Sequence, residues 1–192
     1  MSSLDRDFDE LRGRVKHGRE LNHASFEPIY YLVFSPEEIL TVKRHLPSWV
    51  ARLQERDGWS VSVFSMAEAI ETLHQTSRLR PLWLSADRRE PQNWQRTNES
   101  LANALVHEKV LQIKLEEFLA EKAQQPNHLV LVTDLEALHP YLRIGAIESG
   151  LQGKFQLPTV FLYPGTRSGK TGLRFLGFYP EDGNYRSVHV GG

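Results

Sequence analysis

Short apolar runs alternate along this chain with segments whose apolar residues recur at helical spacing. Residues 29–34 (IYYLVF), 129–133 (LVLVT) and 159–163 (TVFLY) are apolar on both faces, as expected of strands buried inside a parallel sheet. The segments between them are long enough to carry crossover helices. We therefore predict a three-layer α/β/α fold whose central sheet has about five mainly parallel strands.

The remaining elements follow from the same periodicities. Helices are predicted for residues 3–18, 36–58, 65–76, 97–125 and 142–151, and two further strands for residues 59–64 and 173–178. Gly18 is expected to end the first helix, and Pro47 is expected to kink or restart the second. Residues 77–96 show no clean period and are predicted to form an irregular crossover.

The last part of the chain favours an antiparallel end to the sheet. Only residues 164–172 separate the last two strands, so we predict a C-terminal hairpin there. In the tail, the alternation of Val188, His189 and Val190 fits an edge strand with the valines facing in and His189 facing out. The alternative is that residues 182–192, with the adjacent turn at residues 164–172, form a docking surface.

We treat residues 1–192 as one domain.

Composition excludes several classes of function. The chain has no cysteine, which excludes disulfides, zinc ribbons and thiol nucleophiles. Its 23 basic and 24 acidic residues give a net charge of −1, which argues against strong nucleic-acid binding by the isolated protein. The apolar runs are too short to cross a membrane, and the first residues do not have the pattern of a signal peptide. We expect a cytoplasmic protein with no membrane contact.

Residues 164–171 (PGTRSGKT) follow a buried strand and look at first like a phosphate-binding loop. Pro164 replaces the first glycine of that motif, and the segment that follows is predicted to be a strand rather than a helix. We therefore predict a P-loop-like layout without a phosphate loop, and no bound cofactor.

An acidic cluster follows the 129–133 strand. Asp134 and Glu136, at the end of that strand, could serve a nucleotide- or metal-dependent hydrolase or nuclease, with His139 and Glu148 as further ligands. Their spacing matches no defined ligand pattern. The plainer interpretation is that Asp134 caps the following turn while Glu136 pairs with an arginine, so we predict neither a metal nor a catalytic site.

Basic and aromatic residues near the end of the chain predict an interaction surface. Arg167, Lys170, Tyr179, Tyr185 and Arg186 are of the types that dominate protein–protein hot spots. The same types would suit nucleic acid, but the balanced net charge favours a protein partner.

Four stretches of the chain strongly resemble the BrxB family, a small component of bacteriophage exclusion (BREX) defence systems. They are residues 133–143 (TDLEALHPYLR), 147–155 (IESGLQGKF), 163–167 (YPGTR) and 175–187 (FLGFYPEDGNYRS). Residues 27–34 and 44–47 extend the resemblance upstream.

The BrxB resemblance implies a context rather than a reaction. Proteins of this family are encoded beside a PglX-like methyltransferase, a BrxC-like ATPase and a PglZ-like protein, which is the expected partner. The family supplies no established catalytic residues, so the resemblance implies a non-catalytic adaptor that binds the PglZ-like protein. It leaves open contacts with other BREX components and a homodimer.

Overall fold

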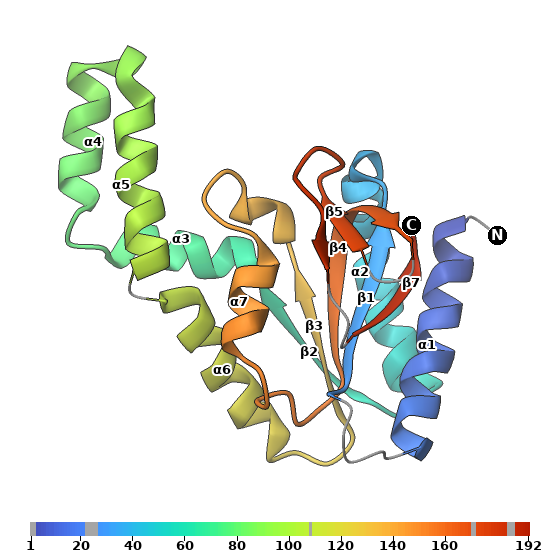
Figure 1. Ribbon diagram of the computed structural model, residues 1–192. Coiled ribbons are helices and arrows are strands. Elements are labelled where there is room, and N and C mark those ends of the chain that lie inside the picture. The colour runs from blue at the N-terminus through green and yellow to red at the C-terminus, as the bar shows by residue number, and fades with distance from the viewer. Residues whose placement is uncertain (1–2, 22–26, 108, 170–171, 184–186) are drawn as a thin grey trace.

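A computed structural model describes residues 3–21, 27–107, 109–169, 172–183 and 187–192 (Figure 1). The helices are α1 (Ser3–Leu21), α2 (Ile39–Glu55), α3 (Met66–Thr76), α4 (Arg80–Arg89), α5 (Trp94–His107), α6 (Val110–Ala123) and α7 (Ile144–Gly150). The strands are β1 (Ile29–Phe34), β2 (Ser60–Ser65), β3 (His128–Thr133), β4 (Thr159–Ser168), β5 (Gly172–Phe175), β6 (Asp182–Gly183) and β7 (Val188–Gly191). Three 3-10 helices are η1 (Pro36–Glu38), η2 (Pro91–Asn93) and η3 (Leu135–Leu138). Within these described ranges, no helix is long and apolar enough to cross a membrane.

The central sheet has the strand order β2-β3-β4-β1-β7, and each neighbouring pair along it is parallel. Past the parallel part, β4 continues and pairs antiparallel with β5, which pairs in turn with β6. This arrangement confirms the predicted sheet of about five mainly parallel strands and the antiparallel hairpin. The carboxyl ends of the parallel strands point to the upper side of Figure 1.

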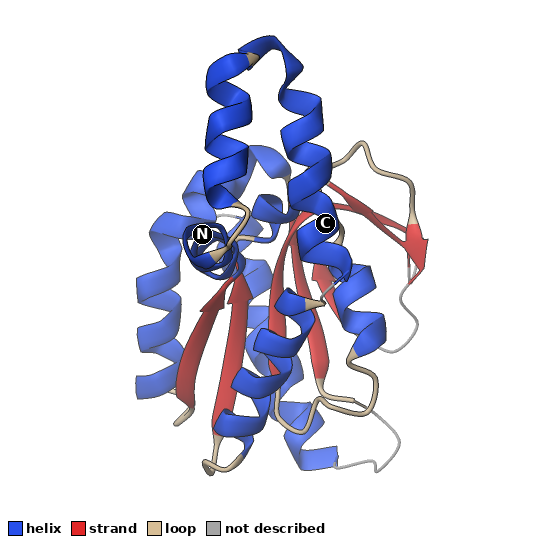
Figure 2. Cartoon of the chain, turned by 90° about the vertical axis from the view of Figure 1, so that its left-hand side faces the viewer, coloured by secondary structure: helices blue, strands red, loops and turns tan. Residues whose placement is uncertain are grey.

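Helices cover both faces of the sheet (Figures 1 and 2). Tyr30, Leu32 and Phe34 of β1 join a core with α1 and α2, whereas Tyr31 and Val33 join a second core with α3, α6 and α7. Because successive side chains of a strand point to opposite faces, a strand buried on both faces must be apolar throughout. This requirement explains why β1, β3 and β4 were predictable from their sequences.

Helix α1 is held against α2 by one aromatic contact. The rings of Phe8 and Trp49 are stacked, with 4.4 Å between their centroids and 8° between their planes. Both side chains are almost fully buried. The stack therefore fixes how the two helices cross.

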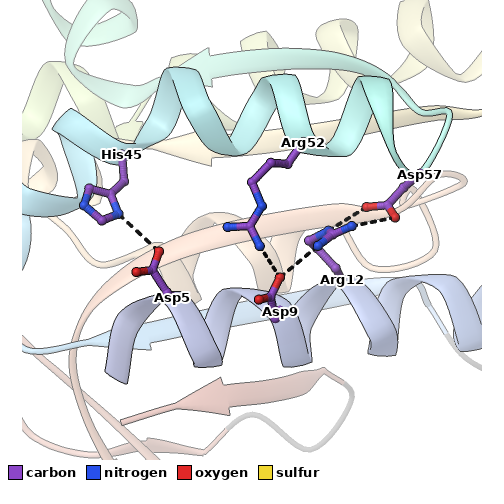
Figure 3. A network of polar contacts seen from close by, with 6 residues as sticks. All are labelled: Asp5, Asp9, Arg12, His45, Arg52 and Asp57. Atoms are coloured by element: carbon purple, nitrogen blue, oxygen red, sulfur yellow. Dashed lines mark hydrogen bonds and ion pairs between the residues drawn. The ribbon is translucent and has the colours of Figure 1, made fainter. Parts of the chain in front are cut away.

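A polar network lies along the same α1–α2 contact (Figure 3). Arg12 donates from Nε and Nη2 to the two carboxylate oxygens of Asp57, at 2.7 and 2.9 Å, and from Nη1 to Asp9 at 2.8 Å. Arg52 of α2 also donates to Asp9. A bidentate, partly buried pair within a network stabilises more than an isolated surface ion pair does, so the network reinforces the aromatic stack.

The predicted irregular crossover at residues 77–96 is wrong. These residues form α4, η2 and the beginning of α5. Helix α4 buries only Trp83, so it has no apolar stripe that a periodicity argument could detect. Pro81 lies in the first turn of α4, where its missing N–H group costs no helical hydrogen bond.

The single long helix predicted for residues 97–125 is two helices. Lys109 has a left-handed backbone conformation with φ of 49°, which ends α5 before α6 begins. Leu101 and Leu105 of α5 and Leu111 and Leu115 of α6 are all buried. The apolar pattern was therefore detected correctly, but the change of direction within it was not.

The expected end of the first helix at Gly18 and the expected restart of the second at Pro47 are absent from the described residues. Helix α1 continues through Gly18, where a Cβ atom would lie 2.1 Å from the Tyr30 hydroxyl; glycine serves here to let Tyr30 approach, not to end the helix. Helix α2 continues through Pro47, which lies on its exposed side. The predicted strand at residues 173–178 is also shorter, because β5 ends at Phe175.

The tail forms an edge strand, as one of the two alternatives predicted. Strand β7 pairs parallel with β1, and Val190 is buried beside α1 and α2. His189 does not face solvent as expected. It pairs in register with Tyr31, and the two rings contact edge to face with 5.4 Å between their centroids, because the neighbouring strand presents an aromatic side chain on the same face.

The burial of His189 predicts a pH dependence of stability. Burial, reinforced by the charge of Arg167, lowers the pKa of His189 to about 4. An unfolded histidine has a pKa near 6.5. The stability that depends on a neutral His189 is therefore complete above about pH 6.5 and is lost as the pH falls toward about 4. We expect the melting temperature to fall over this range and His189→Gln to flatten the fall, measured by thermal unfolding.

The matched control for this pH experiment is His17→Gln, on the exposed side of α1. This variant removes an exposed ring and leaves the contact of His189 with Tyr31 intact, so the fall in melting temperature that depends on His189 should remain. Equal slopes in the wild type and His189→Gln would show that protonation of this ring does not contribute to the acid sensitivity of the fold.

Candidate functional site

The carboxyl ends of the parallel strands are the first place to look for a functional site. In open α/β sheets, ligands bind outside the carboxyl ends of the strands. Here the connection after β1 leads to α2 on one face, while the connection after β3 leads through η3 to α7 on the other. The acidic residues that follow β3 therefore lie in the expected position.

The start of α2 is determined by its own sequence. Ser35 and Glu38 form a capping box around η1, with Pro36 at the first helical position, as the sequence predicts. The next turns of α2 bring Lys43 over the carboxyl end of β3.

Lys43 binds both carboxylates of the predicted acidic pair. Its Nζ atom lies 2.7 Å from Oδ1 of Asp134 and 2.7 Å from Oε1 of Glu136. The other carboxylate oxygen of Asp134 accepts hydrogen bonds from the hydroxyls of Ser65, at 2.7 Å, and Thr133, at 2.8 Å. The cluster thus connects α2 with the ends of β2 and β3.

The electrostatics of this cluster favour the ionised states of Lys43 and Asp134. Burial alone would raise the pKa of Asp134, but the hydrogen bonds from Lys43, Ser65 and Thr133 outweigh it and lower that pKa. Burial would likewise lower the pKa of Lys43, and the two carboxylates raise it instead. The free space lined by these residues is only about 30 Å³, which is the size of a water molecule. The cluster therefore joins α2 to the ends of β2 and β3 with little free space between them.

The sequence predicts that Asp134 caps the following turn and that Glu136 pairs with an arginine, and both predictions are wrong. Glu136 pairs with a lysine of α2 rather than with an arginine. Asp134 has a left-handed conformation, with φ of 59°, and its side chain makes no capping hydrogen bond to η3. Lys43 was missed because nothing in the local sequence connects a residue of α2 with the end of β3.

His139 and Glu148 do not join Asp134 and Glu136. Glu148 is buried and accepts a hydrogen bond from the Tyr31 hydroxyl. His139 is hydrogen-bonded to Tyr179 instead. In the part of the chain that the structure describes, no three His, Cys, Asp or Glu side chains are grouped so that they could hold a metal ion.

The segment that resembles a phosphate-binding loop belongs to the β4–β5 hairpin. Pro164 lies opposite Phe34 in the sheet, and Gly165 pairs with Phe175 across the hairpin. A Cβ atom at Gly165 would lie 2.3 Å from the backbone oxygen of Arg174, so this glycine is explained by the close approach of β5. Lys170 lies outside the described residues.

An aromatic cluster lies where the loop after β5 meets the segment between η3 and α7. It consists of His139, Arg143, Phe178 and Tyr179. The Phe178 and Tyr179 rings are stacked at 4.8 Å, and the His139 ring meets both edge to face, at 5.5 and 5.6 Å. A hydrogen bond of 2.5 Å joins His139 Nδ1 to the Tyr179 hydroxyl. Phe178 is nevertheless 64% exposed.

Within this cluster, Arg143 connects the Tyr179 ring with the residues that follow it in the chain. Its guanidinium group lies 5.9 Å from the centre of the Tyr179 ring and 3.0 Å from a carboxylate oxygen of Asp182. It also donates to the backbone oxygen of Pro180 at 3.3 Å. The loop that presents Phe178 is therefore held from two sides.

Of the five predicted partner-binding residues, the structure describes two. Tyr179 lies in the aromatic cluster, and Arg167 donates to the backbone oxygen of Gly191 at 3.1 Å, which connects the hairpin to β7. Lys170, Tyr185 and Arg186 lie outside the described residues, so their role stays a prediction.

Phe178 and Arg143 were missed by the sequence analysis. Phe178 was assigned to a strand, whereas Leu176 and Gly177 both have positive φ, of 52° and 76°, and turn the chain before it. Gly177, directly before Phe178, was the available signal for that turn.

A family model described as "BREX protein BrxB" matches residues 63–190. The match includes the β4–β5 hairpin and the aromatic cluster, but it does not include residues 27–34 and 44–47. No curated protein and no solved structure matches the chain.

Proposed function

The chain belongs to the BrxB family of BREX phage-defence proteins, and we propose that within such a system it is a non-catalytic assembly component that binds a PglZ-like protein. The observation that carries this proposal is the exposed, tightly held aromatic cluster of His139, Arg143, Phe178 and Tyr179.

Exposed aromatic residues that are already rigid suit protein binding. Docking a partner on Phe178 would remove apolar surface from water without first ordering a mobile loop, because Arg143 and His139 hold the loop in place. Tyrosine and arginine are also enriched among the residues that dominate binding energies. The proposed partner surface therefore combines this cluster with Arg167 and with Lys170, Tyr185 and Arg186.

The state of the acidic pair supports a non-catalytic role. A carboxylate that holds Mg²⁺ or activates water needs open coordination positions facing a substrate. Asp134 instead directs its two oxygens to Lys43, Ser65 and Thr133, and the adjoining space has room for about one water molecule. The rival function, a hydrolase or nuclease using Asp134 and Glu136, would require Lys43 to be displaced.

Replacing Phe178 by alanine tests the proposed surface. We expect Phe178→Ala to keep the wild-type melting temperature within a few degrees and to weaken binding of the PglZ-like protein by roughly thirtyfold, which corresponds to the ~2 kcal/mol of an interface hot spot. Co-purification from cells that express both proteins, followed by titration of the purified pair, measures this effect. The matched control is Leu40→Ala, another exposed apolar side chain, on α2.

Two outcomes would count against the proposed function. If the wild-type chain does not bind the PglZ-like protein, the partner is wrong. If the purified chain has a metal-dependent ATPase or nuclease activity that Asp134→Ala abolishes, the non-catalytic assignment is wrong.

A further inference from the structure

Helices α4 and α5 form a hairpin that does not cover the sheet. In both Figure 1 and Figure 2 it extends beyond the carboxyl ends of the strands, away from the helices that pack on the sheet faces. Trp83, Leu101 and Leu105 join the core at the base of the hairpin, whereas residues 86–96 are exposed.

The base of this hairpin is anchored by Trp83. Its ring is buried and stacks on His74 of α3, with 5.8 Å between the centroids, and its Nε1 atom donates to the hydroxyl of Ser100 on α5 at 2.9 Å. Farther out, Thr97 donates to Asp87 at 2.7 Å. These contacts fasten α4 to α5 and both helices to α3.

Between the two helices lies an open groove of about 390 Å³. On the α4 side it is lined by apolar residues, among them Leu79 and Leu82, and Leu82 is 65% exposed. Near the tip of the hairpin, Trp94 is 56% exposed. Groups of exposed apolar side chains of this kind are typical of interaction sites.

The hairpin also carries uncompensated positive charge. Residues 77–107 contain five arginines and three carboxylates, so this segment has a net charge of +2, whereas the rest of the chain carries −3. Arg89 and Arg96 line the groove. No ion pair among the described residues involves an arginine of this segment.

We propose that the α4–α5 groove binds an acidic amphipathic helix of another protein of the same defence assembly. Leucine-sized side chains spaced at i, i+3 or i+4, and i+7 would contact Leu79, Leu82 and Ala86 of the groove, as in helix-in-groove recognition. Flanking Asp or Glu residues would pair with Arg89 and Arg96. This inference rests on the assembly role proposed above.

Other occupants fit this groove less well. Two copies that met groove to groove would bring segments of like charge together. A nucleic-acid strand needs cations along its whole backbone, whereas this groove offers two arginines beside Glu90 and apolar side chains. A small molecule would remain largely exposed in a groove whose main apolar residue is itself mostly exposed.

Site-specific photo-cross-linking tests the proposal in the assembled system. A photoreactive amino acid is placed at Leu82 of the full chain, or at Leu40 as the matched exposed control on α2, and each chain is co-expressed with the neighbouring BREX genes. We expect a covalent protein adduct at position 82 but not at position 40. Mass spectrometry should place the adduct in an acidic segment with leucines at helical spacing.

Charge reversal then tests the electrostatic part of the proposal. Arg89→Glu with Arg96→Glu should reduce the yield of this adduct about fivefold or more, while Arg6→Glu with Arg56→Glu, an equal change of charge on exposed residues of α1 and the α2 end, should not. Thermal unfolding of each variant verifies that the fold is retained.

The outcomes separate this inference from the proposed function. Co-purification of the PglZ-like protein is measured in the same cells. If that protein is retained but position 82 gives no more adduct than position 40, or gives an adduct with nucleic acid or with a basic segment, the inference is overturned. If that protein is lost while an acidic helix of another component is cross-linked, the inference stands and the proposed partner is wrong.

Discussion

Removal of residues 185–192 should lower the melting temperature by roughly 10 °C. The deletion takes away β7, and with it the buried Val190 side chain, the backbone pairing with β1 and the contact of His189 with Tyr31. Burial of one valine contributes about 2 kcal/mol, and the lost hydrogen bonds add a similar amount. In a chain of this size each kcal/mol corresponds to about 2–4 °C. Thermal unfolding measures the loss.

The matched control for the β7 deletion is the double variant Tyr185→Ala/Arg186→Ala. It leaves the strand itself intact, so folding should be nearly unchanged. If residues 185 and 186 contact the PglZ-like protein, this variant should weaken co-purification without lowering the melting temperature. A deleted chain that melts at the wild-type temperature would contradict the structural role of β7.

Replacing Trp49 by alanine should destabilise the fold by about 3–5 kcal/mol. Trp49 is 1% exposed and stacks on Phe8, so the change leaves a large cavity between α1 and α2. Denaturant unfolding monitored by circular dichroism measures this effect. Trp94→Ala removes the same side chain from an exposed position and should change stability by less than about 0.5 kcal/mol.

A small effect of Trp49→Ala would mean that the stack of Phe8 on Trp49 does not hold α1 to the rest of the fold. The polar network of Figure 3 would then have to carry this contact, and Arg12→Ala would become the more damaging change.

The elements that were predicted correctly are those in which local sequence and burial agree. Strands β1, β3 and β4 are buried on both faces. Because every side chain of such a strand is buried, its sequence is a continuous apolar run, which is easily recognised. Helix α4 was missed because a single buried tryptophan leaves no periodic pattern. His189 was misplaced because alternation along β7 shows which residues share a face, but not what covers that face.

The candidate site was less predictable because its contacts join distant parts of the chain. Asp134 and Glu136 were recognisable as carboxylates at a strand end, but their partner Lys43 lies on another crossover helix. Tyr179 was recognised by residue type, whereas Phe178 depended on the turn at Leu176 and Gly177. Residue type thus indicated candidates, and only the tertiary fold decided which of them meet.

The position of β1 in the sheet has a consequence for how the chain is made. Ile29 pairs with Thr159 and Tyr30 with Val188, so both neighbours of β1 are synthesised long after it. At about 5–20 residues per second, the ribosome needs on the order of ten seconds to supply the first of them. During that interval residues 29–34 (IYYLVF) lack both strands that pair with them in the fold, β4 and β7. Exposed apolar segments of this kind aggregate. We expect newly made chains to depend on chaperones that shield this segment during translation, and folding to be slow because its central contacts are so far apart in sequence.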